Sequence, residues 1–518
     1  MTRKPLVLAT VCLAALTINL DTTIVNVALP SLAVELDADT RDLLWIVDGY
    51  NLAFAALVLA MGSLSDKLGR RPALIAGLAG FALSSGVAAL VDSSEALIAL
   101  RFVMGISAAL IFPTTLSIIT NTFSDRRERA AALGLWGAAT GVGVALGPVA
   151  GGFLLEHYSW HSVFWALVPV AVLTIVMALA FVPESRDLSV PRLDLPGLVV
   201  SVAGLGTLTW TIIEAPQHGW SSATTVAGFA AAALLIAVFV QIERAVEHPM
   251  LDVRLFTDRR FSAACGAVTI AFFALFGFIF LITQYFQFVR DYSALSTGLR
   301  ILPVATCIAI ASIAGGYLAP RVGTKAVVAT GLALLGTSFL WISDVEVATS
   351  YSATIVPQMV LMGLGLGLVS TPATESILQV LPPARAGVGS AVNDATRELG
   401  GTLGVAVIGS VFTSIYADRI VESLRGVLDP AALRGAEESV GFADSLGAQL
   451  PGVTEAMQAA FIDGLHVGCL VIGLLCLAGA TAALLALPGR HYVHPQSDAA
   501  AGGALADEGL GSMGAARH

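Results

Sequence analysis

The sequence predicts an all-α membrane protein with fourteen membrane-spanning helices, arranged as two six-helix halves with two extra helices between them. Its 518 residues are 56% apolar and only 12% charged, with a mean hydropathy of +0.83. The polar side chains are therefore too few to cover a water-soluble globule of this length. Apolar runs of about 20 residues, the length that a helix needs to cross a bilayer, recur along the chain. A loop sequence that follows the second run is repeated after the tenth, which indicates two related halves.

Each apolar run is expected to be a helix, because lipid offers no hydrogen-bond partners to backbone N–H and C=O groups. The edges of the spans are least sharply defined in the central pair. The predicted spans are residues 6–29, 43–64, 73–92, 96–120, 131–154, 163–182, 196–213, 223–242, 264–287, 297–318, 326–343, 353–379, 391–416 and 465–487.

The distribution of Lys and Arg predicts the orientation. An even number of spans places both termini on one side of the membrane. If that side is the cytoplasm, 19 of the 27 Lys and Arg residues fall in the tails and inside loops and 6 fall outside, while Arg101 and Arg397 are embedded. Positive residues concentrate on the cytoplasmic side. We therefore expect a multi-pass protein of the cell membrane with cytoplasmic termini.

The spans divide the chain into consecutive parts. We predict an N-terminal half over residues 1–185, the two extra helices over 186–262 and a C-terminal half over 263–490. The long outside loop, 418–463, holds 8 acids and 3 arginines and is expected to form a solvated cap or an amphipathic segment. Residues 491–518 are rich in Gly and Ala without apolar periodicity, which predicts a disordered cytoplasmic tail. The net charge of −10 does not by itself predict a binding partner.

The repeated loop sequence lies directly after spans two and ten. The first copy, Gly62–Arg71, reads Gly-Ser-Leu-Ser-Asp-Lys-Leu-Gly-Arg-Arg, and a weaker copy, Gly316–Lys325, follows 254 residues later. Both keep two glycines, a leucine and the final base, whereas Pro320 stands in place of Asp66. A degenerate repeat at half-chain distance is typical of transporters built from two similar halves around a site near the middle of the bilayer.

These features resemble the major facilitator superfamily and, within it, the fourteen-span drug:proton antiporters, over nearly all of residues 6–487. The first loop matches the superfamily signature, in which the aspartate pairs with bases on neighbouring helices to hold one conformation. Span one carries Leu20–Pro30, much like a motif of these exporters. The resemblance therefore implies a conformational latch made of Gly62, Asp66, Gly69, Arg70 and Arg71.

Span five resembles the antiporter signature of exporters most closely. Glycines four residues apart let helices approach closely, and a proline interrupts the backbone hydrogen bonds, so we expect a bend or a gating contact here. For any single glycine, packing alone is the simpler interpretation. The residues of this signature are Gly134, Gly143, Gly147, Pro148, Gly151 and Gly152.

Ionisable side chains inside apolar spans are the candidate site, because a charge near the centre of a membrane helix costs roughly 2.5 to 3.5 kcal/mol. Asp21 in span one is the leading candidate proton carrier. Arg101 in span four resembles the embedded arginine tied to proton coupling in this family. Burial disfavours the ionised carboxylate and the arginine favours it, so the two opposing effects could poise Asp21 for proton exchange. The alternatives are a permanent Asp21–Arg101 pair or a hydrogen bond to Thr22 or Asn26.

Asp48 belongs to a segment of span two, Trp45–Asn51, that looks like the segment of exporters handling quaternary ammonium compounds and dyes. A carboxylate beside aromatic faces suits a lipophilic cation. The alternative, which the sequence slightly favours, is a solvated residue at the outer interface with Trp45 and Tyr50 as interfacial anchors.

Spans twelve and thirteen carry the remaining embedded acids. Glu375 is predicted to be buried and to carry a proton. Asp394 and Glu398 are four residues apart and share a helical face, and a salt bridge with Arg397 is the preferred account of both. The candidate residues for proton coupling are Asp21, Arg101, Glu375 and Glu398, and those for substrate binding are Asp48, Asn26, Asn393 and Asp394.

The resemblance implies a proton-coupled antiporter that exports drug-like, amphiphilic and cationic molecules by alternating access. The expected partners are a small-molecule substrate, protons and the lipid bilayer, with no nucleic acid, no cofactor and a monomeric state. Export of one natural product, such as an antibiotic or siderophore, is an alternative, and a non-transporting sensor is another. An enzyme is disfavoured, because the sequence has no hydrolase elbow, zinc-protease motif or phosphate-binding loop and no catalytic or metal-ligating cluster.

Overall fold

The computed structural model describes residues 4–186, 194–247, 249–380 and 386–487. The described residues form helices and no strand of a sheet, and fourteen helices are long and apolar enough to cross a membrane. Each overlaps one predicted span, so the predicted fold class is confirmed. The helices are α1 (Lys4–Glu35), α2 (Thr40–Leu68), α3 (Arg70–Ala88), α4 (Ser94–Thr122), α5 (Arg126–His157), α6 (His161–Phe181), α7 (Leu195–His218), α8 (Ala223–Ala245), α9 (Arg259–Gln284), α10 (Ala294–Val322), α11 (Thr324–Ile342), α12 (Val356–Gln379), α13 (Ala386–Leu424) and α16 (Val453–Ala486).

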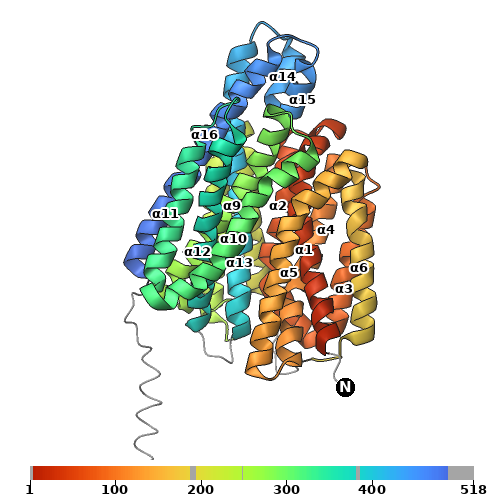
Figure 1. Ribbon diagram of the computed structural model, residues 1–518, viewed down its shortest axis with the longest axis vertical. Coiled ribbons are helices and arrows are strands. Elements are labelled where there is room, and N and C mark those ends of the chain that lie inside the picture. The colour runs from red at the N-terminus through yellow and green to blue at the C-terminus, as the bar shows by residue number, and fades with distance from the viewer. Residues whose placement is uncertain (1–3, 187–193, 248, 381–385, 488–518) are drawn as a thin grey trace, which may run out of the picture.

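Three short helical segments adjoin the spans: η1 (Val253–Thr257), η2 (Tyr285–Val289), which continues α9, and η3 (Tyr351–Ile355), which precedes α12. Helices α1 to α6 pack on one another, and α9 to α13 pack with α16. Figure 1 shows these two halves side by side. The predicted tail, 491–518, lies outside the described residues.

Matching turns in the two halves support the internal repeat. Gly69 and Gly323, 254 residues apart, end α2 and α10 with φ angles of +117° and +95°, a backbone conformation that favours glycine. Asp37 and Asp291, also 254 residues apart, both have a φ of +51°. The two halves therefore use the same turn chemistry at equivalent positions.

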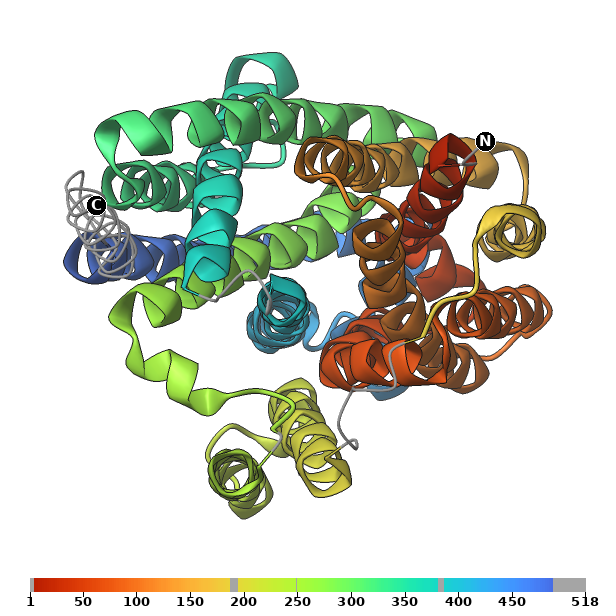
Figure 2. The ribbon, with the colours of Figure 1, turned by 90° about the horizontal axis from the view of Figure 1, so that it is seen from below.

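The two extra helices lie against both halves. Helix α7 packs on α2, on α13 and on α8, and Figure 2 shows this pair at the edge of the bundle. The Ser410 hydroxyl of α13 donates to the backbone oxygen of Ile212 at 2.8 Å. Toward the N-terminal half, the Arg41 side chain at the start of α2 lies 3.5 Å from the Glu214 carboxylate of α7. Helix α7 thus bridges the two halves at one end of the molecule.

The predicted loop 418–463 is shorter than the sequence suggested. Helix α13 continues to Leu424 and α16 begins at Val453, because polar side chains beyond the apolar span need not end a helix. Arg419 pairs with Asp463 across these two extensions, with an N–O distance of 3.0 Å. The remaining residues, 425–452, contain α14 (Pro430–Glu438) and α15 (Val440–Gly447) and are called the cap here. The cap end is the end of the molecule that carries α14 and α15, and the terminal end is the opposite end, where α1 begins and α16 ends (Figure 1).

The cap docks on the N-terminal half. The Thr40 hydroxyl donates to the Glu438 backbone oxygen at 3.1 Å, and the Ser439 hydroxyl donates to the Ala38 backbone oxygen at 3.3 Å. Glycine at position 441 allows α15 to lie against Ala33 of α1. A segment from the C-terminal half therefore contacts the turn between α1 and α2.

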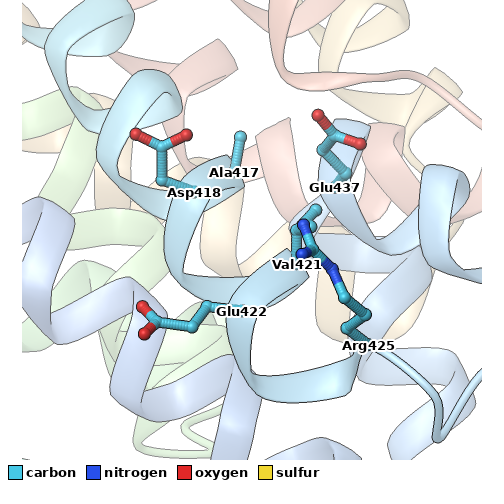
Figure 3. Close-up of a pocket in the computed structure, with 6 residues that line it drawn as sticks. All are labelled: Ala417, Asp418, Val421, Glu422, Arg425 and Glu437. Carbon is cyan, nitrogen blue, oxygen red and sulfur yellow. The ribbon is translucent and has the colours of Figure 1, made fainter.

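An acidic groove of about 240 Å³ lies where α13 meets the cap. Figure 3 shows Asp418 and Glu422 on the α13 side and Glu437 on the α14 side, with Arg425 at the end of α13. Asp418, Glu422 and Arg425 are exposed. This groove is a solvated surface feature, in contrast to the buried cavity described next.

Candidate functional site

Asp21 and Arg101 form a buried ion pair inside the N-terminal half. The Arg101 Nη1 atom lies 2.8 Å from Asp21 Oδ2, and the two side chains are 1% and 0% exposed. Arg101 also donates from Nε to the Ile46 backbone oxygen at 2.9 Å, and its guanidinium lies 4.4 Å from the centre of the Tyr50 ring. The structure therefore contains the pair that the sequence offered as one alternative, and it joins α1, α2 and α4.

A second group of charges faces a cavity between the halves. The cavity measures about 60 Å³ and is bounded by α1, α2, α4, α5, α9 and α13. Its charged residues, Asp394, Arg397 and Glu398, all belong to α13, and α1 contributes polar groups. The lining residues are Ile18, Asn19, Thr22, Thr23, Phe54, Phe112, Val144, Phe272, Leu275, Phe276, Ile279, Asp394, Arg397 and Glu398.

The charged groups of this cavity are only partly satisfied. Within the described part of the chain, Asp394 Oδ2, Glu398 Oε2 and Arg397 Nε are buried atoms without a hydrogen-bond partner. The predicted salt bridge with Arg397 is not formed among the described residues. The guanidinium instead lies 5.1 Å from the centre of the Phe272 ring and donates to Thr374 Oγ1 at 3.4 Å. Two carboxylates therefore face the cavity with free acceptor oxygens.

Aromatic rings connect the buried ion pair to the cavity. The centroid distances are 6.1 Å from Tyr50 to Phe54, 5.7 Å from Phe54 to Phe112 and 5.0 Å from Phe112 to Trp136. Aromatic faces attract organic cations. The cavity is far smaller than the roughly 300 to 1,000 Å³ of sites for drug-sized ligands, so a large ligand would require the two halves to move apart around it.

Asp48 lies in a different environment from the one that the sequence favoured. The side chain is 0% exposed and, among the described residues, neither carboxylate oxygen has a hydrogen-bond partner. Tyr50, expected at the interface, is also fully buried. Leu44, four residues before Asp48 on the same face of α2, packs against Gly409 of α13. Asp48 therefore faces the junction of the halves, and the prediction of a solvated interfacial residue is wrong.

Glu375 is exposed, in contrast to the prediction that it is buried. It lies one turn before the end of α12, where its Oε1 atom accepts a hydrogen bond from Gln379 Nε2 at 2.8 Å. Hydropathy alone could not show that this position lies at the terminal end and points outward. The structure removes Glu375 from the embedded acids.

The two candidate asparagines flank the cavity. Asn26 donates to the Thr22 backbone oxygen at 2.9 Å, and its buried Oδ1 atom has no partner within the described residues. Asn393 accepts a hydrogen bond from Thr374 Oγ1 at 2.9 Å and lies 3.5 Å from Asp394 Oδ1. Neither lines the cavity. In the part of the chain that the structure describes, no group of three or more His, Cys, Asp or Glu side chains could hold a metal ion.

The glycines of α5 divide into a packed set and an open set. A Cβ atom on Gly147 would lie 1.9 Å from Thr23 Oγ1, and one on Gly152 would lie 2.5 Å from the Ala294 backbone oxygen of α10. Gly143 and Gly151 likewise pack on α1. By contrast, a Cβ atom on Gly134 would meet nothing within 4 Å.

Gly134, Gly141, Pro148 and Gly152 share one face of α5, as their spacing of 7, 7 and 4 residues shows. That face is packed on α10 at the cap end, where Gly298 of α10 lies against the Pro148 backbone, and is open at the terminal end. The backbone of Val27 near the end of α1 also accepts from Gln287 of η2 at 3.1 Å. These contacts close the cap end between the halves.

The predicted latch loop ties three helices together. Arg70 Nε lies 2.7 Å from Asp66 Oδ1, and the Arg70 backbone N–H donates to the Ser185 oxygen at 2.8 Å. Arg71 donates to the Leu179 backbone oxygen of α6 at 2.7 Å. A Cβ atom on Gly69 would clash with Glu184, and Gly62 packs near Pro113 of α4. The aspartate therefore pairs with a base of α3 at the terminal end.

Residues 11–405 match the sequence profile of the Major Facilitator Superfamily. The chain belongs to this superfamily of transporters. It is 36% identical to the multidrug efflux pump LfrA of Mycolicibacterium smegmatis over 484 residues, which cover 92% of this chain and 95% of that protein. It is 30% identical to the tetracenomycin C resistance and export protein of Streptomyces glaucescens, covering 92% of this chain and 90% of that protein.

Solved structures agree with the superfamily fold. A bacterial homologue of the human lysosomal transporter Spinster, crystallised in an inward-facing and unoccupied conformation, gives a TM-score of 0.65 at 17% identity. The match covers 93% of this chain and 96% of that one. At this identity the likeness concerns the fold alone, and it agrees with the all-helical fold of this major facilitator protein.

Sequence reasoning missed most of the neutral cavity lining of this major facilitator transporter. Asn19 and Thr22 are ordinary polar residues of an apolar span, and Phe54, Phe112 and Phe276 look like the aromatics that face lipid elsewhere. The signal that could have found Thr22 is its position one residue after Asp21. No comparable signal marks the phenylalanines.

The latch loop of this transporter gives a first prediction. Replacing Asp66→Asn removes the charge that pairs with Arg70 and keeps one acceptor oxygen. A loss of about 0.5 to 1 kcal/mol, as for a partly exposed ion pair, would slow turnover roughly two- to fivefold. Equilibrium binding of substrate should change little, because the loop is far from the cavity. Transport rates and binding titrations on purified protein measure both quantities.

Asp92→Asn is the matched control, because Asp92 is an exposed aspartate at the cap end and its only ion pair among the described residues is with a histidine. It should leave both quantities unchanged. Loss of equilibrium binding with normal exchange rates in the Asp66→Asn variant would contradict the latch.

Proposed function

We propose that this transporter is a proton-coupled antiporter that exports amphiphilic, cationic, drug-like molecules. The observation that carries the proposal is the pair of carboxylates, Asp394 and Glu398, whose unpartnered oxygens face an aromatic-lined cavity between the halves. An ionised carboxylate in such a place is costly without a cation, a proton or a partner. A lipophilic cation and a proton can each remove that cost, so they compete for the same groups.

The names of its relatives support export of drug-like molecules. They include a multidrug efflux pump and the methyl viologen resistance protein SmvA of Salmonella typhimurium, which is 31% identical over 89% of this chain and 94% of that protein. Export of a single natural product is the second candidate, and the tetracenomycin C export protein favours it. A panel of unrelated cations separates the two, because a dedicated exporter would move one of them.

The proposed exchange has two half-cycles. With the cavity open to the cytoplasm, ionised Asp394 and Glu398 bind the cation, and the rings of Phe112 and Phe276 cover its apolar parts. After the halves rock to open the cap end, protons from outside neutralise the carboxylates and the cation leaves. The Arg101 guanidinium stacks on Tyr50, and Tyr50 packs against Phe54 of the cavity lining. In this proposal, a change in the charge of α13 therefore alters the electrostatic environment of the Asp21–Arg101 pair.

The orientation belongs to the same proposal. We place the terminal end in the cytoplasm of a cell whose plasma membrane holds the transporter as a monomer. The Lys and Arg distribution supports this, since positive residues concentrate on the cytoplasmic side. With this orientation, the closed cap end is the outer end of the transporter.

A labelling experiment tests the orientation. Lys67 is exposed at the terminal end and Val427 is exposed on the cap. A membrane-impermeant thiol reagent added to intact cells should label the Val427→Cys variant and spare the Lys67→Cys variant, which should react only after the membrane is opened. The reverse pattern would show that the termini face outward.

Reconstituted transport tests the antiport. Vesicles containing the transporter and an acidic interior should accumulate ethidium, a fluorescent cation, while valinomycin and equal potassium hold the membrane potential at zero. A protonophore should abolish the accumulation. Accumulation that persists without a pH gradient would contradict proton coupling, and absence of any protein-dependent dye movement would contradict export of such cations.

A further inference from the structure

Within the described part of the chain, Arg397 is the one cationic side chain that lines the cavity. The lining from α1, α2, α4, α5 and α9 is neutral, so the charge of the cavity is set by α13 alone. The nearby Asp21–Arg101 pair contributes opposite charges that cancel. With Asp394 and Glu398 both ionised, the cavity carries a net charge of −1, because Arg397 offsets one of the two carboxylates.

Arg397 is close to both carboxylates without being locked to either. It lies three residues after Asp394 and one residue before Glu398 on α13, and all three side chains line the same cavity. Among the described residues, Arg397 forms no ion pair within 4.0 Å, and its Nε atom has no hydrogen-bond partner. The guanidinium is held by the Phe272 face and by a 3.4 Å contact to Thr374 Oγ1. It is therefore placed to compensate charge and to leave both carboxylates accessible.

We propose that Arg397 is a specificity-determining residue that acts as a built-in cation and makes the cavity prefer ligands with one positive charge. This inference rests on the proposed binding of cations at Asp394 and Glu398. A monocation neutralises the remaining charge of −1. A dication leaves the buried cavity with a charge of +1, and an uncompensated charge in a low-dielectric site is strongly unfavourable.

The test compares two dyes that share a phenanthridinium ring, the monocation ethidium and the dication propidium. Binding to purified transporter in nanodiscs is titrated at a pH at which binding has reached its alkaline plateau. Arg397→Gln keeps a donor for Thr374 and removes the charge, so the cavity carries −2. The ratio of propidium to ethidium affinity should rise at least about tenfold, which is a differential of about 1.4 kcal/mol. Arg397→Lys keeps the charge and should leave the ratio near that of the wild type.

The Glu398→Gln variant should change the ratio of propidium to ethidium affinity in the opposite direction. It also provides a test if the Arg397→Gln variant does not fold. It brings the cavity to a net charge of 0, so the affinity ratio should fall in favour of ethidium while both affinities weaken. Arg419→Gln removes an equal charge from an exposed ion pair at the cap end and should change neither affinity.

The variants distinguish the role of Arg397 from the binding of cations at Asp394 and Glu398. An unchanged ratio in Arg397→Gln, together with weaker ethidium binding in Glu398→Gln, would overturn the role of Arg397 and leave the cation site standing. Unchanged ethidium binding in an Asp394→Asn, Glu398→Gln double variant would overturn the cation site itself. A ratio that rises equally in Arg397→Lys would show that ring stacking, and not charge, sets the preference.

Discussion

Replacing Glu398→Gln should abolish uphill, proton-driven export while leaving the protein folded. The substitution keeps the size of the side chain and removes the acid whose Oε2 atom faces the cavity without a partner. A hydrogen bond to a charged group contributes about 1.5 to 3 kcal/mol, so cation affinity should fall roughly 10- to 150-fold. Reconstituted uptake of ethidium against its gradient and equilibrium titration measure the two effects.

The sign of the pH effect follows from linkage. Raising the pH removes protons from Asp394 and Glu398, and a cation binds the ionised forms, so affinity should rise with pH until both acids are ionised. By reciprocity, cation binding must release protons. In the Glu398→Gln variant, both the pH dependence of binding and the number of protons released should shrink. Uphill export that survives in the Asp394→Asn, Glu398→Gln double variant would show that neither acid carries the coupling proton.

Asp21 requires a different test, because its partner is buried with it. Removing one member of a buried ion pair costs about 3 to 5 kcal/mol through the charge that is left behind. An Asp21→Asn variant would therefore confound folding with coupling, since Arg101 would remain. The double variant Asp21→Asn, Arg101→Gln removes both charges together and is the appropriate comparison.

The helical architecture could be predicted from the sequence because the bilayer imposes it. Backbone groups in lipid have no solvent partners, so every long apolar run is a helix, and all fourteen predicted spans overlap a helix of the structure. The same dependence on the bilayer explains why hydropathy did not predict the full lengths of α13 and α16, which extend beyond their apolar spans. Hydropathy marks where the lipid ends, whereas Asp418, Arg419 and Glu422 continue the helix in water.

The candidate site was only partly predictable, because hydropathy gives the depth of a residue and not the direction in which it points. Glu375 and Glu398 both lie in apolar windows, yet the first is exposed at the end of α12 and the second faces the cavity. Asp48 looked interfacial because Trp45 and Tyr50 flank it. Its burial arises from the packing of α2 on α13, a contact between segments that are more than 300 residues apart.

Replacing Gly298→Ala should shift the transporter away from the state that is closed at the cap end. A Cβ atom at this position of α10 would lie 2.1 Å from the Pro148 backbone oxygen of α5. Backbone atoms cannot turn aside as a side chain can, so the two helices must separate. Overpacking of this kind costs about 1 to 3 kcal/mol, which changes the balance between two conformations roughly 5- to 150-fold.

Accessibility of the cavity from the cap side measures this shift. Thr22 lines the cavity, and a Thr22→Cys variant should react slowly with an impermeant thiol reagent supplied at the cap end. Adding Gly298→Ala should speed that reaction and slow turnover, because the molecule returns to the cap-closed state less readily. Gly134→Ala is the matched control, since a Cβ atom there meets nothing within 4 Å in this state and alanine favours the helix by about 1 kcal/mol. It should not speed the reaction, and equal acceleration by both variants would mean that the contact between Gly298 and Pro148 does not hold the cap end closed.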